Sequence, residues 1–101
     1  MNNRLLAAPL GMSTRITAGK DVIFAELGEE ISLLSIQSGF YYMLNAVAAS
    51  VWRQINQPTS LTEIKIHLLE EFNVEESRCE RDLMRIVEDL HSHGLIEVPS
   101  S

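Results

Sequence analysis

The side chains of this sequence that could act in acid–base or metal chemistry are few and far apart. The histidines are His67, His91 and His93, and Cys79 is the one cysteine. Residues two apart on a helix do not share a face, so His91 and His93 cannot act together there. This set lacks the spacing of a zinc site. The sequence therefore predicts no metal and no other cofactor.

Cys79 falls on the apolar stripe of a long amphipathic segment, where a free thiol packs as a small hydrophobic group. A single cysteine forms no internal disulfide, which fits a reducing cytoplasm. The glycines stand singly, so no glycine-rich phosphate loop is present. These features predict a protein that is not an enzyme.

Length and charge narrow the class further. The chain has 101 residues, is 46% hydrophobic and carries a formal net charge of -6. That length suits one domain with a packed core. An acidic domain repels phosphate backbones, so we expect no nucleic-acid partner. The sequence shows neither a membrane-length apolar run nor a secretory signal, and we expect a cytoplasmic protein without membrane contact.

The apolar pattern predicts three strands, at residues 22–27, 31–36 and 40–44, joined by short turns. Sequential strands with short turns form an antiparallel meander. Residues 1–20 are expected to be a flexible N-terminal arm, although the alternating stretch 12–17 could lie along the sheet. The recognisable domain is expected to span residues 21–98.

Helices are expected to fill most of the remaining chain. Asn45 can cap a helix over residues 46–54, and Ser60 with Glu63 forms a capping box for a second helix. A third helix is expected over residues 75–93, ending at Gly94. Its expected inner stripe is Cys79, Leu83, Ile86, Val87 and Leu90. The predicted fold class is α+β, a winged helix-turn-helix-like arrangement of a three-stranded antiparallel sheet followed by three helices.

Two binding functions fit this arrangement. In a winged-helix DNA-binding regulator the third helix would meet the DNA, but its exposed acids outnumber Arg78, Arg81 and Arg85. A peptide binder would instead use an edge strand, whose free N–H and C=O groups accept an extended chain. A third alternative is a structural subunit in which the N-terminal arm covers that edge.

Several stretches together resemble the PqqD-like family. They are the strand and turn up to Gly39, the run Tyr41-Tyr42-Met43-Leu44-Asn45 with Trp52, Leu61-Thr62-Glu63-Ile64, Glu71-Phe72-Asn73-Val74, and His93-Gly94-Leu95-Ile96. The resemblance covers residues 21–98. Ala48 departs from it, since relatives often have glycine there.

The resemblance implies a recognition element for ribosomally synthesised and post-translationally modified peptides (RiPPs). Such a domain binds the leader peptide of a precursor by strand addition to its third strand, with its third helix as the other wall. The implied peptide-binding residues are Ser38, Phe40, Tyr41, Tyr42, Met43 and Leu44 on the strand, and Arg78, Arg81, Asp82, Arg85 and Ile86 on the helix.

The resemblance also implies partners. Lasso-peptide recognition proteins act beside a separate leader peptidase of the cysteine-protease type and an ATP-dependent cyclase. Their leaders carry a tyrosine and a proline, for which Tyr41, Met43 and Ile86 could line pockets. The alternative is a PqqD-type chaperone that presents its precursor peptide to a radical enzyme.

Overall fold

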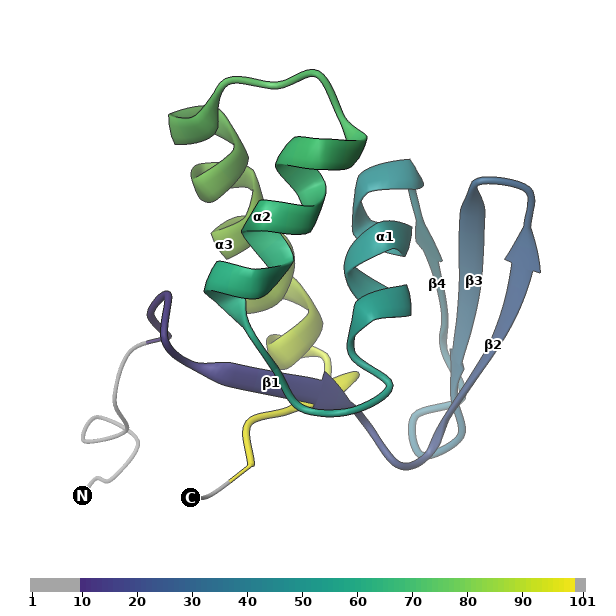
Figure 1. Ribbon diagram of the computed structural model, residues 1–101. Coiled ribbons are helices and arrows are strands. Elements are labelled where there is room, and N and C mark those ends of the chain that lie inside the picture. The colour runs from purple at the N-terminus through teal and green to yellow at the C-terminus, as the bar shows by residue number, and fades with distance from the viewer. Residues whose placement is uncertain (1–9, 100–101) are drawn as a thin grey trace.

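The computed structural model describes residues 10–99. Its elements, in chain order, are β1 (Arg15–Ala18), β2 (Val22–Leu27), β3 (Glu30–Ser35), β4 (Tyr41–Leu44), α1 (Ala46–Gln54), β5 (Thr59–Ser60), α2 (Leu61–Glu71), α3 (Glu76–Ser92) and β6 (Ile96–Glu97). Figure 1 shows a three-stranded sheet beside α1, with α2 and α3 on the far side of that helix. The expected α+β class, with antiparallel sheets and three helices, is confirmed. The winged-helix likeness describes the arrangement only loosely.

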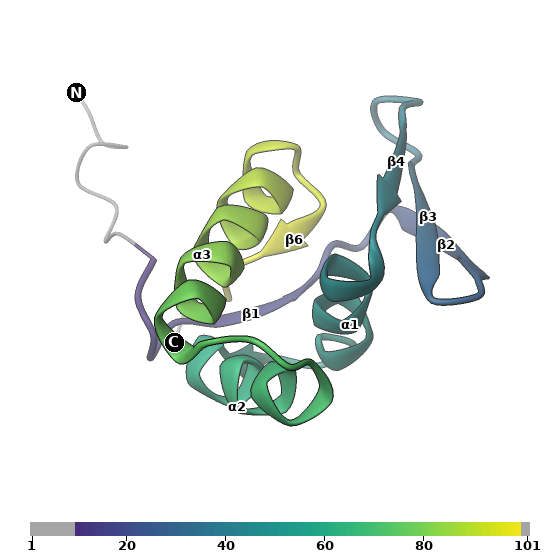
Figure 2. The same ribbon diagram turned by 90° about the horizontal axis from the view of Figure 1, so that it is seen from above.

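The three predicted strands are β2, β3 and β4, and they pair antiparallel in that order. Gly28 and Gly39 have φ of 69° and 78° in the two connecting turns, a conformation that glycine adopts without strain. Ile31 and Leu33 on β3 are buried on the face toward α1. The other face of this sheet has no helix over it (Figure 2), so its apolar side chains remain exposed.

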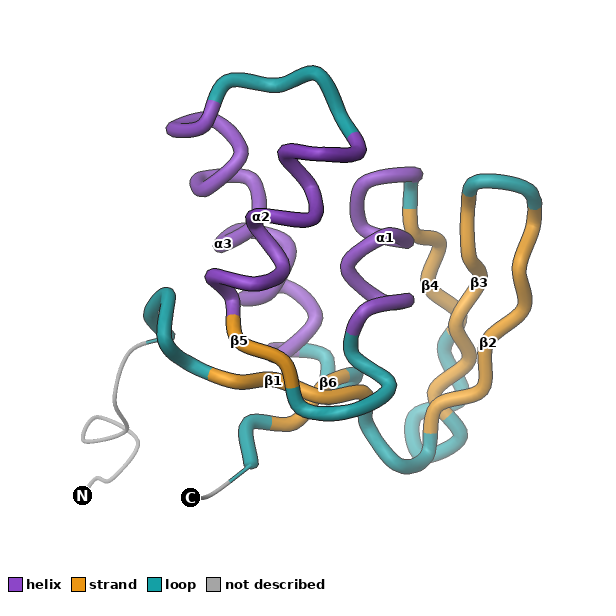
Figure 3. Tube along the Cα trace, in the orientation of Figure 1, coloured by secondary structure: helices purple, strands orange, loops and turns teal. Residues whose placement is uncertain are grey.

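The expected flexible arm over residues 1–20 is wrong for its second half. Residues 1–9 lie outside the described part, but Arg15–Ala18 forms strand β1. This strand pairs with β5 on one side and β6 on the other, in a second small sheet that crosses beneath the helices (Figure 3). Ile16 is fully buried there. The segment is ordered because Ile16 enters the core while both edges of the strand find partners. It pairs with none of the meander strands.

The helix ends follow the predicted caps. The side chain of Asn45 accepts a hydrogen bond from the Ala48 N–H at 2.9 Å and starts α1 directly after β4. Ser60 and Glu63 form the expected capping box at α2. Gly94 ends the third helical segment with φ of 72°. Because Asn45 leaves no loop between β4 and α1, the strand and the helix are fixed relative to each other.

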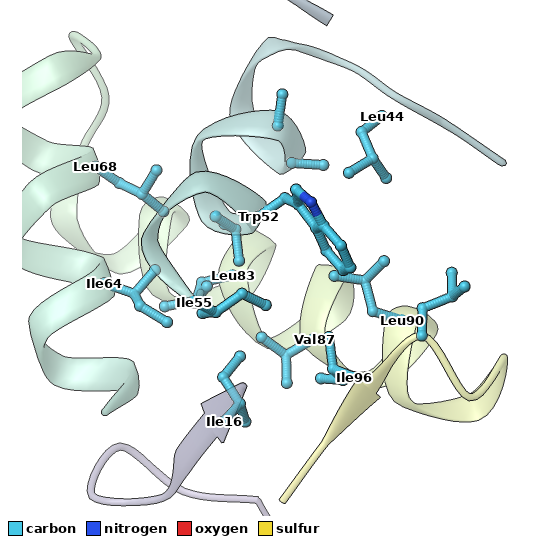
Figure 4. Close-up of a cluster of buried hydrophobic side chains, with 14 of the residues drawn as sticks. Ile16, Leu44, Trp52, Ile55, Ile64, Leu68, Leu83, Val87, Leu90 and Ile96 are labelled. Carbon is cyan, nitrogen blue, oxygen red and sulfur yellow. The ribbon is translucent and has the colours of Figure 1, made fainter. Parts of the chain in front are cut away.

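The core lies between the helices and both sheets. Trp52 of α1 packs among Leu44, Leu83, Val87 and Leu90 in the buried cluster (Figure 4). On α3 the buried residues are Cys79, Leu83, Val87 and Leu90. Ile86 was expected on this stripe but is only partly buried. It lies on the flank of α3 that faces β4. No helix of the described residues is long and apolar enough to cross a membrane.

Candidate functional site

Strand β4 is an edge of the meander, and its backbone pattern shows which groups are free. The Ser35 N–H donates to the Phe40 carbonyl at 3.0 Å, and Leu33 and Ile31 stand opposite Tyr42 and Leu44. Hydrogen-bonded pairs alternate along an antiparallel ladder. The N–H and C=O groups of Tyr41 and Met43 therefore face away from β3, and no described strand pairs with them.

An open groove runs between this edge and α3. Its volume is about 290 Å³. It is lined by Met43, Leu44, Asn45, Val47, Ala48, Asp82, Arg85, Ile86, Asp89 and Leu90. Pockets that bind whole small molecules usually have at least this volume and enclose most of the ligand, which an open groove does not do. A shallow groove beside a free strand edge instead suits an extended chain that inserts some of its side chains.

The side chains of β4 alternate between the face toward α1 and the outer face, and Met43 borders the groove at the strand edge. Leu44 is buried and Tyr42 is half-buried, while Tyr41 and Met43 are 72% and 59% exposed. The ring of Tyr42 lies 5.0 Å from the ring of His93, with the two planes tilted by 54°. Tyr42 and His93 thus mark one end of the groove, beside the last turn of α3.

Charged groups line the helix side of the groove. The carboxylate of Asp82 lies 3.1 Å from the guanidinium of Arg85 and 3.7 Å from that of Arg78. Asp89 lies one turn after Arg85 on α3, with its carboxylate 3.7 Å from Nδ1 of His93. That nitrogen also lies 2.8 Å from the Asp89 carbonyl oxygen. The wall therefore offers both signs of charge above an apolar floor.

The groups that sequence analysis considered for catalysis do not line this groove. Cys79 is 3% exposed in the core, and burial raises the pKa of its thiol, which disfavours the reactive thiolate. Among residues 10–99 no three His, Cys, Asp or Glu side chains come close enough together to hold a metal ion. The groove has the features of a binding surface.

Comparison with known proteins identifies the family. The family model for coenzyme PQQ synthesis protein D (PqqD) matches residues 30–96. The chain belongs to the PqqD family. The matched range begins with β3 and includes both walls of the groove, so the predicted resemblance is confirmed. No curated protein sequence matches the chain.

Two solved structures are similar to this PqqD-family chain. One is TbiB1 in complex with the TbiA(beta) leader peptide, with 27% identity and a TM-score of 0.76 over 84% of this chain and 99% of that one. The other is a lasso peptide synthetase B1 complexed with the leader peptide, with 28% identity and a TM-score of 0.69 over 81% of this chain and 96% of that one. The similarity extends over almost the whole length of each of the two solved chains.

The structure brings some predicted site residues of this PqqD-family chain together and separates others. Met43, Leu44, Asp82, Arg85 and Ile86 all line the groove. Tyr41 presents its backbone to the same edge, and Tyr42 closes one end. Arg78 reaches the groove only through its ion pair with Asp82.

The other three predicted residues lie outside the groove. Arg81 lines a separate depression with Ser77, Glu80, Met84, Arg85 and Glu88, so the geometry gives it no place beside β4. Ser38 and Phe40 belong to the turn before β4, where the Phe40 N–H donates to the Ser38 hydroxyl at 3.3 Å. They lie next to the strand edge without lining the groove.

Sequence reasoning missed Asn45, Val47, Ala48, Asp89 and Leu90. Asp89 had a usable signal, because it lies four residues after Arg85 and therefore on the same face of α3. Ala48 was noted as a departure from glycine but not as part of the site. Asn45 and Val47 enter the groove only because α1 begins directly after β4, and no spacing rule along one element shows that contact.

Proposed function

We propose that this protein binds the leader peptide of a ribosomally synthesised precursor, of the lasso-peptide type, as an added strand on β4. The observation that carries the proposal is the free edge of β4 facing α3 across an open groove with an apolar floor. Two similar structures, both described as leader-peptide complexes, support the same use of this fold.

The mechanism of binding follows from the strand geometry. The leader would exchange backbone hydrogen bonds with Tyr41 and Met43, whose N–H and C=O groups face the edge. Successive side chains of a strand point to opposite faces. Alternate leader side chains would enter the groove against Leu44, Ile86 and Leu90. The side chains between them would lie beside Tyr41 and Met43 on the outer face. Main-chain bonds supply affinity and the groove supplies selectivity.

The proposed role in the pathway is non-catalytic delivery in the cytoplasm. A bound leader holds its precursor close to any enzyme that associates with this domain, and such tethering raises the effective concentration of substrate. A leader peptidase of the cysteine-protease type and a cyclase are the proposed recipients. The match to coenzyme PQQ synthesis protein D favours a second candidate, a peptide chaperone for a radical enzyme. Binding tests with leaders of the two precursor classes separate these roles.

The decisive experiment titrates labelled leader peptide from the neighbouring precursor gene and follows fluorescence anisotropy. The Met43→Pro variant removes one free N–H from the β4 edge without removing a ladder bond to β3. Glu26→Pro is the control for a proline on an edge strand, because the Glu26 N–H faces the free edge of β2 on the opposite side of the same sheet. It also removes the carboxylate that pairs with Arg53. Circular dichroism of both variants verifies the fold.

We expect wild type and Glu26→Pro to bind the leader equally and Met43→Pro to lose binding. Equal loss in both proline variants would point to a general disturbance of the sheet. Failure of the wild-type protein to bind any local leader would refute the proposed function. A steep loss of affinity with salt would instead indicate contacts dominated by charge, as with nucleic acid.

A further inference from the structure

The groove has a direction, because β4 and α3 run oppositely along its two sides. Tyr42, near the start of β4, lies against His93 just beyond the end of α3. Arg85 is two helical turns before His93 and so lies toward the end of β4, where α1 begins. Figure 2 shows the same opposed courses of β4 and α3. The two ends of the groove therefore have different chemical surroundings.

The end where α1 begins is positive. Asp82 is shared by Arg85, which lines the groove, and by Arg78 beside it, so two guanidinium groups face one carboxylate at this end of α3. The first turn of α1 lies at the same end, with Val47 and Ala48 lining the groove and no acidic residue in that turn. The amides at a helix N-terminus carry partial positive charge. Both contributions favour an anionic group.

The opposite end is negative. Asp89 lines the groove, and the cation nearest to it is the His93 ring at 3.7 Å, which is charged only when protonated. The last carbonyls of α3 lie at this end and carry partial negative charge. Arg85 and Asp89 share a helix face and are separated by one turn, about 6 Å along the axis.

We propose that the groove selects its leader peptide by the order of charge in the sequence, an inference that rests on the proposed function. An acidic leader side chain lies opposite Arg85, and a basic side chain two residues later lies opposite Asp89. Residues two apart on a strand are separated by about 6.6 Å and point to the same face. This separation is close to the rise of about 6 Å between Arg85 and Asp89. The order follows from antiparallel pairing with β4, the more stable arrangement per residue. The leader then continues past Tyr42 and His93 toward the part of the precursor that is modified.

Two versions of the neighbouring leader test this order. One carries glutamate and then lysine at two successive groove-facing positions, opposite Arg85 and Asp89, and the other carries them reversed, so that composition and net charge are equal. We expect the glutamate-first peptide to bind about three- to tenfold more tightly at low salt, since each exposed ion pair contributes modestly. The preference should shrink as salt is added.

Exchanging the charges of the groove sharpens the test. Arg85→Asp combined with Asp89→Arg should invert the preference and favour the lysine-first peptide. The control exchanges charges beside the groove, with Arg81→Asp and Glu88→Arg, neither of which lines it. This control should keep the wild-type preference.

The outcomes separate this inference from the proposed function. Equal affinity for the two peptides, with binding still lost in Met43→Pro, would overturn the charge order and leave strand addition standing. A wild-type preference for the lysine-first peptide would also overturn it. Absence of binding to either peptide and to the natural leader would refute both proposals. The peptide pair on the wild-type protein decides the matter even if the exchanged variant fails to fold.

Discussion

The two edges of the β2–β3–β4 sheet differ in length, in charge and in what lies beside them. The β2 edge has six residues and carries Glu26, whose carboxylate lies 2.9 Å from the guanidinium of Arg53 on α1. The β4 edge has four residues, Tyr41–Leu44, and none of them is charged. The sheet thus has one edge that carries a charged ion pair, on β2, and one edge without charged residues, on β4.

The presence of a cavity next to the strand does not distinguish the β4 edge from the β2 edge, because both edges have one. A cavity of about 400 Å³ lies next to β2, lined by Ala18, Val22, Phe24, Glu26, Trp52, Arg53 and Asn56. It is larger than the groove beside β4. Charged side chains on an edge strand oppose pairing with another chain, because pairing would strip them of water. We infer that Glu26 and Arg53 oppose strand addition at the β2 edge, whereas β4 carries no charged residue that would oppose it.

The largest expected effect comes from placing a charge in the groove. Ile86→Asp puts a carboxylate where an apolar leader side chain would pack. Covering an unpaired charge is costly. We expect leader affinity to fall about ten- to a hundredfold by fluorescence anisotropy. Val22→Asp places the same charge in the hollow beside β2 and should leave affinity unchanged. Equal losses from both variants would show that the two edges are not functionally distinct.

The next effect separates stability from binding with one aromatic residue on each edge. The ring of Phe24 lies 6.3 Å from that of Trp52 in an edge-on contact. Phe24→Ala should lower the free energy of unfolding by about 1–2 kcal/mol, because the side chain is half-buried, and leave leader affinity unchanged. Tyr41→Ala should cost under about 0.5 kcal/mol, because Tyr41 is mostly exposed, yet weaken leader binding several-fold.

Urea unfolding and anisotropy titrations on these two variants form a crossed design. The prediction fails if Tyr41→Ala destabilises the protein more than Phe24→Ala does, or if Phe24→Ala weakens leader binding as much. Either result would mean that the outer side chains of β4 support the fold rather than a bound peptide.

The sequence predicted the meander and the three helices because their signals are local. Alternating apolar residues, glycines at turns that need positive φ, and the caps at Asn45 and Ser60 each act within a few residues. It did not predict that Arg15–Ala18 pairs with β5 and β6, because those partners are two-residue strands far along the chain. Strand β5, Thr59–Ser60, has no apolar pattern of its own, and the apolar residues around β6 do not show which strand it pairs with.

The candidate site was predictable on β4 and less so on α3. The apolar run 40–44 indicates the strand, and the family resemblance implied its peptide-binding residues. On α3 the inner stripe and the groove stripe lie next to each other, and helical spacing alone did not separate Ile86 from Val87 or exclude Arg81. The three-dimensional position of β4 makes that separation, since only one flank of α3 faces the strand.

A smaller effect, on self-association, tests whether the Glu26–Arg53 ion pair protects the β2 edge from pairing with another chain. Glu26→Ala combined with Arg53→Ala removes both charges and uncovers the end of the β2 edge, where Arg53 also approaches the carbonyls of Gly28 and Glu29. We expect weak self-association at high protein concentration, measured by sedimentation velocity, with unchanged leader affinity. Glu88→Ala combined with Arg81→Ala removes the same two charges away from both edges and should stay monomeric to the same degree as wild type. Identical sedimentation of both variants would contradict a guarding role.

The smallest effect concerns the contacts that hold α3 in place opposite β4. The helix beside each edge of the sheet is held in a different way. The wall beside β2 is α1, joined directly to β4, whereas α3 is held partly by Lys65 of α2. The Lys65 ammonium lies 2.9 Å from the Glu76 carboxylate. That hydrogen bond lowers the pKa of Glu76 below its ordinary value of 4.5. A carboxyl with a lowered pKa stabilises the folded state above 4.5, and this contribution disappears as the pH falls through the lowered pKa.

Lys65→Met should therefore be slightly less stable than wild type at neutral pH, and the difference should vanish under acid conditions. Glu76 also raises the pKa of Lys65, so the contribution persists on the alkaline side until the pH rises through that raised pKa, above the ordinary 10.5. Urea unfolding at a series of pH values measures the loss of stability on the acid side and on the alkaline side, with Lys20→Met as the control for loss of a lysine. A pH-independent difference between Lys65→Met and wild type would show that lost packing, not the ion pair, is responsible. A difference confined to the predicted window would show that charge helps hold α3 opposite β4.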